Sequence, residues 1–252
     1  MEKKTIGICD SGVGGLFVLE SMLEHHPYYN YVYIADQINA PYGDSDYDTI
    51  LSNSKKIMNY FESRDIDEVI IACNTMCSTV INDLHSLYPR IKFHSIIAPT
   101  CNQLNDINKD ILVIATNATV KAHAYKTYIN ENYEGKNVYE LACPKFVPLI
   151  ENEASEEELQ LAVNHYLNEY VDKVDTIILG CTHYPVIKPQ INNCFDVKIY
   201  DSNSIICNEF ENLNITEKGE LEIYTTKDEE EMIIQIKKLF KKEYLVKFLK
   251  LN

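Results

Sequence analysis

Two stretches of the chain place a cysteine directly after an apolar run. Ile177 to Pro185 reads IILGCTHYP, and Val69 to Thr75, 108 positions earlier, reads VIIACNT. In both, large aliphatic residues end at a small residue, and residues with hydrogen-bonding side chains follow the cysteine. Such runs predict strands that are buried on both faces. Because ligands bind beyond the carboxyl ends of strands in open α/β sheets, we expect Cys73 and Cys181 to face one cleft from opposite sides.

The two cysteines indicate proton transfer rather than nucleophilic attack. At a strand end, backbone N–H groups and a helix dipole are expected to lower a thiol pKa from its free value of about 8.5, so that either sulfur can act as a base. One such cysteine is typically a buried core thiol, but two in matching contexts favour an active site. Nucleophilic catalysis usually needs one cysteine with a supporting histidine. Two opposed thiols suit a two-base racemisation, in which one sulfur removes a proton from a carbon and the other returns one to the opposite face.

Polar residues beside these cysteines, and a turn-rich loop from 37 to 47, are the expected substrate contacts. We expect the residues that follow the cysteines to donate hydrogen bonds to substrate carboxylates, and two loop residues to close one end of the cleft. The donors are Asn74, Thr75, Thr182 and His183, and the loop residues are Tyr42 and Gly43.

A glycine-rich stretch, DSGVGGL from Asp10 to Leu16, contains three of the eight glycines. Glycine would be needed at position 17 for the dinucleotide fingerprint, but Phe17 stands there, and a Walker lysine is missing too. A carboxylate at Asp10 would repel a phosphate and attract an ammonium group. We therefore interpret Asp10 and Ser11 as an amine-binding pair, with a purely structural turn as the alternative.

Alternating strand and helix patterns predict an α/β fold with parallel sheets and right-handed crossovers. The further strands are expected at Lys4–Asp10, Tyr31–Ala35, Phe93–Ile97, Ile111–Ala115, Val138–Leu141 and Val197–Tyr200. Helices are expected after Asp46, over Thr75–Tyr88, from Ser202, and after capping boxes at Ser155/Glu158 and Thr226/Glu229, whereas prolines predict breaks at 98–100 and 143–148. The repeated cysteine unit predicts two pseudo-symmetric parallel-sheet lobes, with helices on both faces and the active site between them.

Composition excludes several classes of function. The 252 residues carry a net charge of −15, which argues against nucleic acid as a partner because phosphate binding needs a basic face. No segment has the ~20 apolar residues that cross a membrane, and the first residues do not resemble a signal peptide. The eight cysteines form no C-x-x-C pair and have no histidine at zinc-site spacing, so we expect no metal.

Six motifs follow one another along the chain: DSGVGGL at 10 to 16, PYG at 41 to 43, ACNT at 72 to 75, ATNATVKAHAY at 115 to 125, CPKFVPLIE at 143 to 151 and LGCTHYP at 179 to 185. In the order and spacing of these motifs, the chain resembles the glutamate racemases over about residues 5 to 240. LGCTHYP also separates this family from the related aspartate racemases, in which an acidic residue usually follows the Cys-Thr pair.

The resemblance implies a cofactor-independent interconversion of L- and D-glutamate that supplies D-glutamate for peptidoglycan. It implies Cys73 and Cys181 as the catalytic thiols and secondary roles for Thr119 and Glu151. The substrate contacts that it implies are Asp10, Ser11, Tyr42, Gly43, Asn74, Thr75, Thr182 and His183. It further implies a cytoplasmic homodimer without pyridoxal phosphate or metal. Its two lobes would comprise residues 1–97 plus 207–252, and residues 98–206.

Three other interpretations remain open at this point. One is a racemase for aspartate or another acidic amino acid, and another is a non-catalytic amino-acid-binding module that retains the cleft. The third is a redox protein that pairs Cys73 with Cys77, one helical turn away. Cys77, like Cys9, departs from the commoner sequences of the family, and we expect it to pack in the core.

Overall fold

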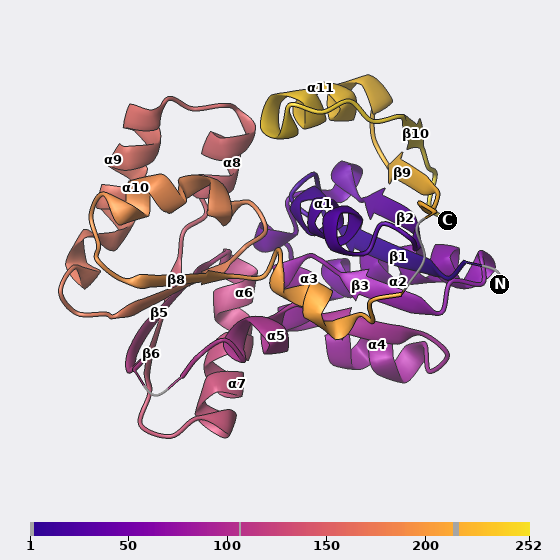
Figure 1. The fold of residues 1–252 in the computed structure, drawn as a ribbon. Helices are drawn as coiled ribbons and strands as arrows, with labels where there is room; N and C mark the ends of the chain where they lie inside the picture. Colours follow the sequence, from indigo (N-terminus) through magenta and orange to yellow (C-terminus); the bar gives the residue numbers. More distant parts are fainter. Residues whose placement is uncertain (1–2, 106, 214–216) are drawn as a thin grey trace.

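Two parallel β-sheets form the framework of the computed structural model, which describes residues 3–105, 107–213 and 217–252 (Figure 1). The larger sheet has six strands in the order β10-β9-β2-β1-β3-β4, and the smaller has four in the order β6-β5-β7-β8. Every strand pairing in both sheets is parallel. The predicted fold class, two parallel-sheet lobes with helices around them, is confirmed.

The central strands are continuous apolar runs because helices cover both faces of each sheet. Every residue of β3 and β7 is buried. The strands are β1 Thr5–Asp10, β2 Asn30–Ala35, β3 Glu68–Ile71, β4 Lys92–Ser95, β5 Asp110–Ala115, β6 Asn137–Ala142, β7 Thr176–Gly180, β8 Lys198–Asp201, β9 Leu221–Thr225 and β10 Val246–Phe248.

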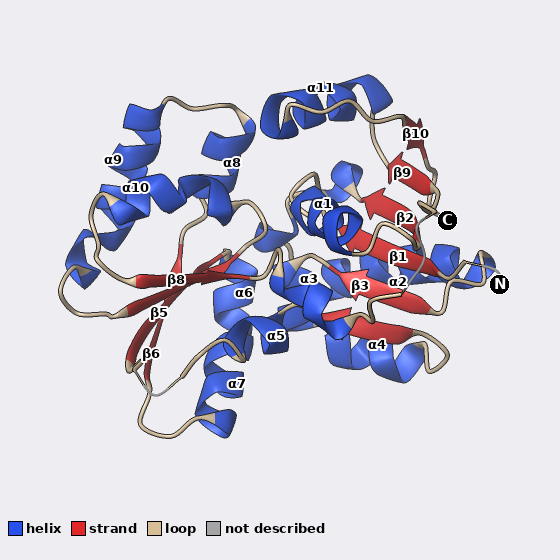
Figure 2. Cartoon of the chain, viewed as in Figure 1, coloured by secondary structure: helices blue, strands red, loops and turns tan. Residues whose placement is uncertain are grey.

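The helices connect these strands (Figure 2), and some of them begin at a residue whose side chain caps the helix. Asp46 caps one helix through Thr49 N, and Ser155 with Glu158 forms the predicted capping box. The α-helices are α1 Leu16–His25, α2 Tyr47–Ser63, α3 Asn74–Thr79, α4 Ile81–Leu87, α5 Ile97–Cys101, α6 Asn117–Ala122, α7 Ala124–Asn132, α8 Phe146–Glu151, α9 Glu156–Leu167, α10 Lys188–Asn192 and α11 Glu229–Phe240. Short 3-10 turns lie at η1 Gln37–Asn39, η2 Tyr42–Asp44, η3 Asn168–Tyr170, η4 Tyr184–Ile187 and η5 Ile205–Glu209.

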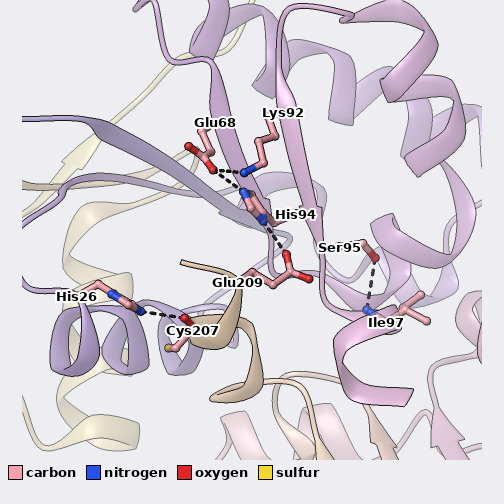
Figure 3. A network of polar contacts seen from close by, with 8 residues as sticks. All are labelled: His26, Glu68, Lys92, His94, Ser95, Ile97, Cys207 and Glu209. Carbon is pink, nitrogen blue, oxygen red and sulfur yellow. Dashed lines mark hydrogen bonds and ion pairs between the residues drawn. The ribbon is translucent and has the colours of Figure 1, made fainter. Parts of the chain in front are cut away.

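The chain returns from the smaller sheet to the larger one through η5. His94 on β4 lies between two carboxylates, with its ring nitrogens 2.7 Å from Glu68 Oε1 and 2.7 Å from Glu209 Oε2 (Figure 3). The His26 ring lies 2.8 Å from the carbonyl oxygen of Cys207. These contacts fix the return segment against the first sheet, after which β9 and β10 extend that sheet at its β2 edge.

Two prolines that were expected to break the chain lie inside helices instead. Pro99 and Pro148 are each the third residue of a helix, α5 and α8. In the first turn a backbone N–H has no intrahelical partner, so proline is tolerated there. The expected break at 98–100 is therefore wrong, and of the expected irregular stretch 143–148 only residues 143–145 lie outside a helix.

Three expected helices also differ from the structure. The helix predicted over Thr75–Tyr88 divides at Val80, and the hydroxyl of Thr79 donates to the Thr75 carbonyl oxygen, a contact that bends helices. The predicted second capping box is wrong, because Asp228 caps α11. The helix expected from Ser202 is only the 3-10 turn η5, which begins three residues later.

Candidate active site

A cavity of about 300 Å³ lies between the two sheets, at the carboxyl ends of β1, β3 and β7. All ten residues predicted from the sequence line it, which are Asp10, Ser11, Tyr42, Gly43, Cys73, Asn74, Thr75, Cys181, Thr182 and His183. The structure therefore brings the two cysteine-bearing strand ends to one shared cavity. Helices α3 and α6 pack against each other where the two halves meet.

Cys73 lies between β3 and α3 and is 5% exposed. Its thiol donates to the Ser11 hydroxyl at 3.8 Å. The expected lowering of its pKa is wrong. Burial, and then the negative charge of Asp10, raise the pKa of Cys73 well above its ordinary value, outweighing hydrogen bonds from the backbone of Met76 and from Ser11. The helix start that should favour a thiolate is outweighed by this burial and by the Asp10 charge.

Cys181 follows β7 and lies beside a histidine. His183 Nδ1 is 3.9 Å from Cys181 Sγ. His183 Nε2 is 2.9 Å from Glu151 Oε1, which is an ion-pair distance although the angle is not that of a hydrogen bond. Burial lowers the pKa of His183, but contacts with Cys181 and Glu151 outweigh it and raise the pKa to about 10. A positive imidazolium therefore lies beside one of the two sulfurs.

Asp10 ends β1 and is buried beneath the glycine turn. The Gly12 N–H donates to Asp10 Oδ1 at 2.8 Å, and the Thr182 hydroxyl donates to Oδ2 at 3.4 Å. Burial raises the Asp10 pKa, while His183 and the Gly12 N–H partly lower it. The carboxylate thus joins the turn to the opposite lobe, and it also lines the cavity.

The loop that contains Tyr42 and Gly43 is held from outside the cavity. Tyr42 OH donates to Asp36 Oδ2 at 2.5 Å, and the same carboxylate accepts from the Thr226 hydroxyl at 2.8 Å. A Cβ on Gly43 would lie 2.7 Å from Thr116 Cβ, so the loop backbone closely approaches the second lobe. Asp36 thus anchors the loop, a role that the sequence did not indicate.

Asn74 and Thr75 are the first residues of α3, and both line the cavity. Thr75 Oγ1 lies 3.0 Å from Thr116 Oγ1 and 3.4 Å from Thr119 Oγ1. Asn74 Nδ2 is buried and finds no hydrogen-bond partner among the described residues. A buried amide without a partner is costly, which indicates a donor kept for a ligand.

Sequence reasoning missed the residues that the C-terminal segment adds to the cavity. Lys227, Glu231 and Gln235 line it from α11 and the turn before it, and Lys238 on α11 pairs with Glu153 of the second lobe at 3.3 Å. Nothing in this segment resembles a site, and only its docking beside β2 brings it to the cavity. Thr116 was also missed, although it follows a strand end as the cysteines do.

The described residues hold neither a metal-binding cluster nor a membrane-spanning helix. Within residues 3–105, 107–213 and 217–252, no three His, Cys, Asp or Glu side chains are grouped to hold a metal ion. None of the helices in those ranges is long and apolar enough to cross a membrane.

Comparison with known proteins identifies the family. A family model described as Asp/Glu/hydantoin racemase matches residues 18–210. The chain is similar to the glutamate racemase of Aquifex aeolicus (37% identity, 88% of each chain) and to that of Aquifex pyrophilus (36% identity, 96% of each chain). It is also similar to the crystal structure of glutamate racemase from Francisella tularensis in complex with D-glutamate, with a TM-score of 0.92, 28% identity and coverage of 100% of this chain and 99% of that one.

The two-sheet α/β fold, with a cysteine after a strand of each sheet in the lining of one cavity, and the family model together place the chain among the amino-acid racemases of the Asp/Glu/hydantoin racemase family. Within that family the chain belongs to the glutamate racemases, as its identity to the two Aquifex proteins over 88% or more of each chain shows.

Proposed function

We propose that this chain racemises glutamate by two-thiol proton transfer, with Cys73 and Cys181 on opposite faces of the substrate Cα. The observation that supports this assignment is the presence of both cysteines in the lining of one cavity between the lobes. D-glutamate made in this way would supply peptidoglycan.

In the proposed reaction one sulfur enters as thiolate and the other as thiol. The thiolate takes the Cα proton, the electron pair of the C–H bond passes toward the α-carboxylate, and the opposite thiol gives its proton to the other face of Cα. The first sulfur ends as thiol and the second as thiolate, so the protons balance. The opposite enantiomer reverses the roles.

The polar side chains of the cavity would bind the substrate and stabilise developing charge. Asp10 and Ser11 would bind the ammonium group, and the donors on the two strand ends would bind the carboxylates, with Asn74 Nδ2 as the buried donor still without a partner in the described chain. The imidazolium of His183 would be the counter-charge when Cys181 carries the negative charge. Because a thiol is a poor base for a weak carbon acid, preorganised donors in a water-excluding cavity must supply much of the barrier reduction.

The test is incubation of L-glutamate with the purified protein in D2O, without added cofactor, while optical rotation and the Cα proton signal are followed. We expect D-glutamate with deuterium at Cα, and we expect L-aspartate to react about 10–200-fold more slowly because it lacks one methylene group. Cys73→Ser and Cys181→Ser should each lose about 10²–10⁴-fold in rate, as removal of an acid or base does.

The same experiment separates the first two rival interpretations, and oxidation of the protein tests the third. Faster reaction of aspartate would replace the substrate assignment. Binding of glutamate without exchange at Cα would indicate a non-catalytic module. Reversible loss of activity through a disulfide between Cys73 and Cys77 would indicate redox control.

We propose further that the lobes comprise residues 1–97 plus 207–252 and residues 98–206, of which residues 1–2, 106 and 214–216 lie outside the described chain. The membership of β9 and β10 in the same sheet as β1 supports this division. We also propose a cytoplasmic homodimer, as the resemblance implies, and light scattering that gave one chain per particle would contradict the dimer.

A further inference from the structure

Tyr125 on α7 contacts both halves of the candidate active site, although its side chain is only 1% exposed. Its hydroxyl donates to Asn74 Oδ1 at 2.5 Å, and Asn74 directly follows Cys73. Its ring lies over Gly180, which directly precedes Cys181, because a Cβ built there would be 3.2 Å from Tyr125 Cε2. One aromatic side chain therefore lies between the two cysteine-bearing strand ends.

The hydrogen bond from Tyr125 to Oδ1 determines which end of the Asn74 amide is left without a partner in the described chain. A phenol that donates must meet the carbonyl oxygen of the amide, so the Nδ2 group is the end left without a partner in the described part of the chain. Burial raises the pKa of Tyr125 well above its ordinary value, which keeps its proton in place. Without this hydrogen bond the Asn74 amide could rotate and turn Oδ1 toward a substrate carboxylate. The two oxygens would then repel each other.

We propose that Tyr125 is a positioning residue that fixes the Asn74 amide, so that Nδ2 donates to a substrate carboxylate, and that ties this donor to the strand end carrying Cys181. The inference rests on the proposed function, because it assumes that the cavity binds an amino-acid carboxylate. It assigns Tyr125 no contact with the substrate.

The test compares Tyr125→Phe with a control from the same helix. Tyr125→Phe keeps the ring over Gly180 and removes only the hydroxyl. Tyr128 OH likewise donates to an asparagine, Asn102 Oδ1, at 2.9 Å, but Asn102 is not part of the cavity lining. Tyr128→Phe therefore removes the same kind of hydrogen bond away from the site.

We expect Tyr125→Phe to raise the KM for glutamate about tenfold, equivalent to about 1.4 kcal/mol, with kcat changed less than about threefold. Tyr128→Phe should leave both constants unchanged. In an Asn74→Ala background, Tyr125→Phe should raise KM no further, because the amide that it positions is gone.

Two results would overturn the inference: an unchanged KM in Tyr125→Phe, or the same rise in KM with and without the Asn74 amide. Thermal unfolding of each variant is measured first. If Tyr125→Phe does not fold, NMR signals of the Asn74 side-chain amide protons in the wild-type protein test whether that amide has one fixed orientation. One orientation that shifts on addition of D-glutamate supports the inference, and two interconverting orientations refute it. Failure of the wild-type protein to racemise glutamate would instead contradict the proposed function.

Discussion

Gly14→Ala is the sharpest test of how the two lobes meet at the cavity. A Cβ on Gly14 would lie 2.3 Å from Thr182 Oγ1 and 2.5 Å from two atoms of the His183 ring. Gly14 belongs to the turn after β1, whereas Thr182 and His183 follow β7 in the other lobe. Because both side chains are at most 5% exposed, neither can move into solvent to make room.

The expected loss can be estimated from these distances. Ordinary contacts are about 3.5–4.0 Å, so the added methyl group requires a displacement of about 1 Å or more between the lobes. Overpacking of this kind costs about 1–3 kcal/mol in stability. It is partly offset by about 0.4–1 kcal/mol because alanine restricts the unfolded chain. A misplacement of 1 Å near reacting atoms costs about 10²-fold in rate, so we expect kcat/KM to fall about 100-fold while the protein still folds.

The assay is racemisation of both enantiomers of glutamate, followed by circular dichroism, together with urea unfolding. Gly12→Ala is the comparison from the same turn, because a Cβ there would meet only Glu151 Oε1, at an ordinary 3.8 Å. We expect Gly12→Ala to lose far less activity than Gly14→Ala. Equal losses in the two variants, or full activity in Gly14→Ala, would refute the close approach of the lobes at this turn.

Three further predictions concern the parts that support the site. Burial raises the Glu68 pKa, but hydrogen bonds from Lys4, Lys92 and His94 outweigh it and lower the pKa from 4.5 to about 2. The stability that Glu68 contributes is therefore present above about pH 4.5 and lost as the pH falls toward 2. It amounts to at most about 3 kcal/mol, and to less than that because solvent screens the charges of the two exposed lysines. Urea unfolding from pH 6 to pH 2 should show this loss in the wild-type protein and a flatter curve in Glu68→Gln. Cys77→Ala removes a thiol that donates to the Ile71 carbonyl oxygen at 3.1 Å. The variant should therefore be about 1–2 kcal/mol less stable in urea unfolding and should racemise glutamate as the wild type does. If Cys77 instead had a redox role, the activity of the variant would resist oxidants. Ser155→Ala removes the capping box of α9 and should cost about 1 kcal/mol in thermal unfolding without changing kcat or KM.

The residues of the candidate site could be predicted because they belong to short local patterns. Cys73 and Cys181 each follow a buried strand, one in each sheet, and ligands bind beyond the carboxyl ends of such strands. Asp10 is the last residue of β1, which lies beside β3 in the same sheet, so three strand ends account for most of the predicted set. The hydrogen-bonding residues beside the cysteines come to the cavity with them.

The rest depends on contacts between residues far apart in the chain. Asp36 was visible only as an acid at a strand end, and its role follows from Tyr42 and Thr226, the latter 190 positions away. The pKa of Cys73 was predicted in the wrong direction because local sequence shows the helix start but not the burial or the approach of Asp10. Tyr125 reads as an apolar position of a helix, and its hydroxyl gains meaning only beside Asn74.

The two thiols occupy corresponding places in the two lobes, yet their surroundings are opposite in charge. Cys73 lies near the Asp10 carboxylate, whereas Cys181 lies near the His183 imidazolium. The two directions of reaction therefore start from states of different electrostatic energy. L- and D-glutamate have the same free energy in water, so kcat/KM must nevertheless be equal in both directions. Any effect of the unequal surroundings must then appear in kcat and KM separately, as proportional changes that cancel in their ratio. A variant such as His183→Asn can shift both constants for one enantiomer relative to the other, but it cannot make the enzyme favour either enantiomer at equilibrium.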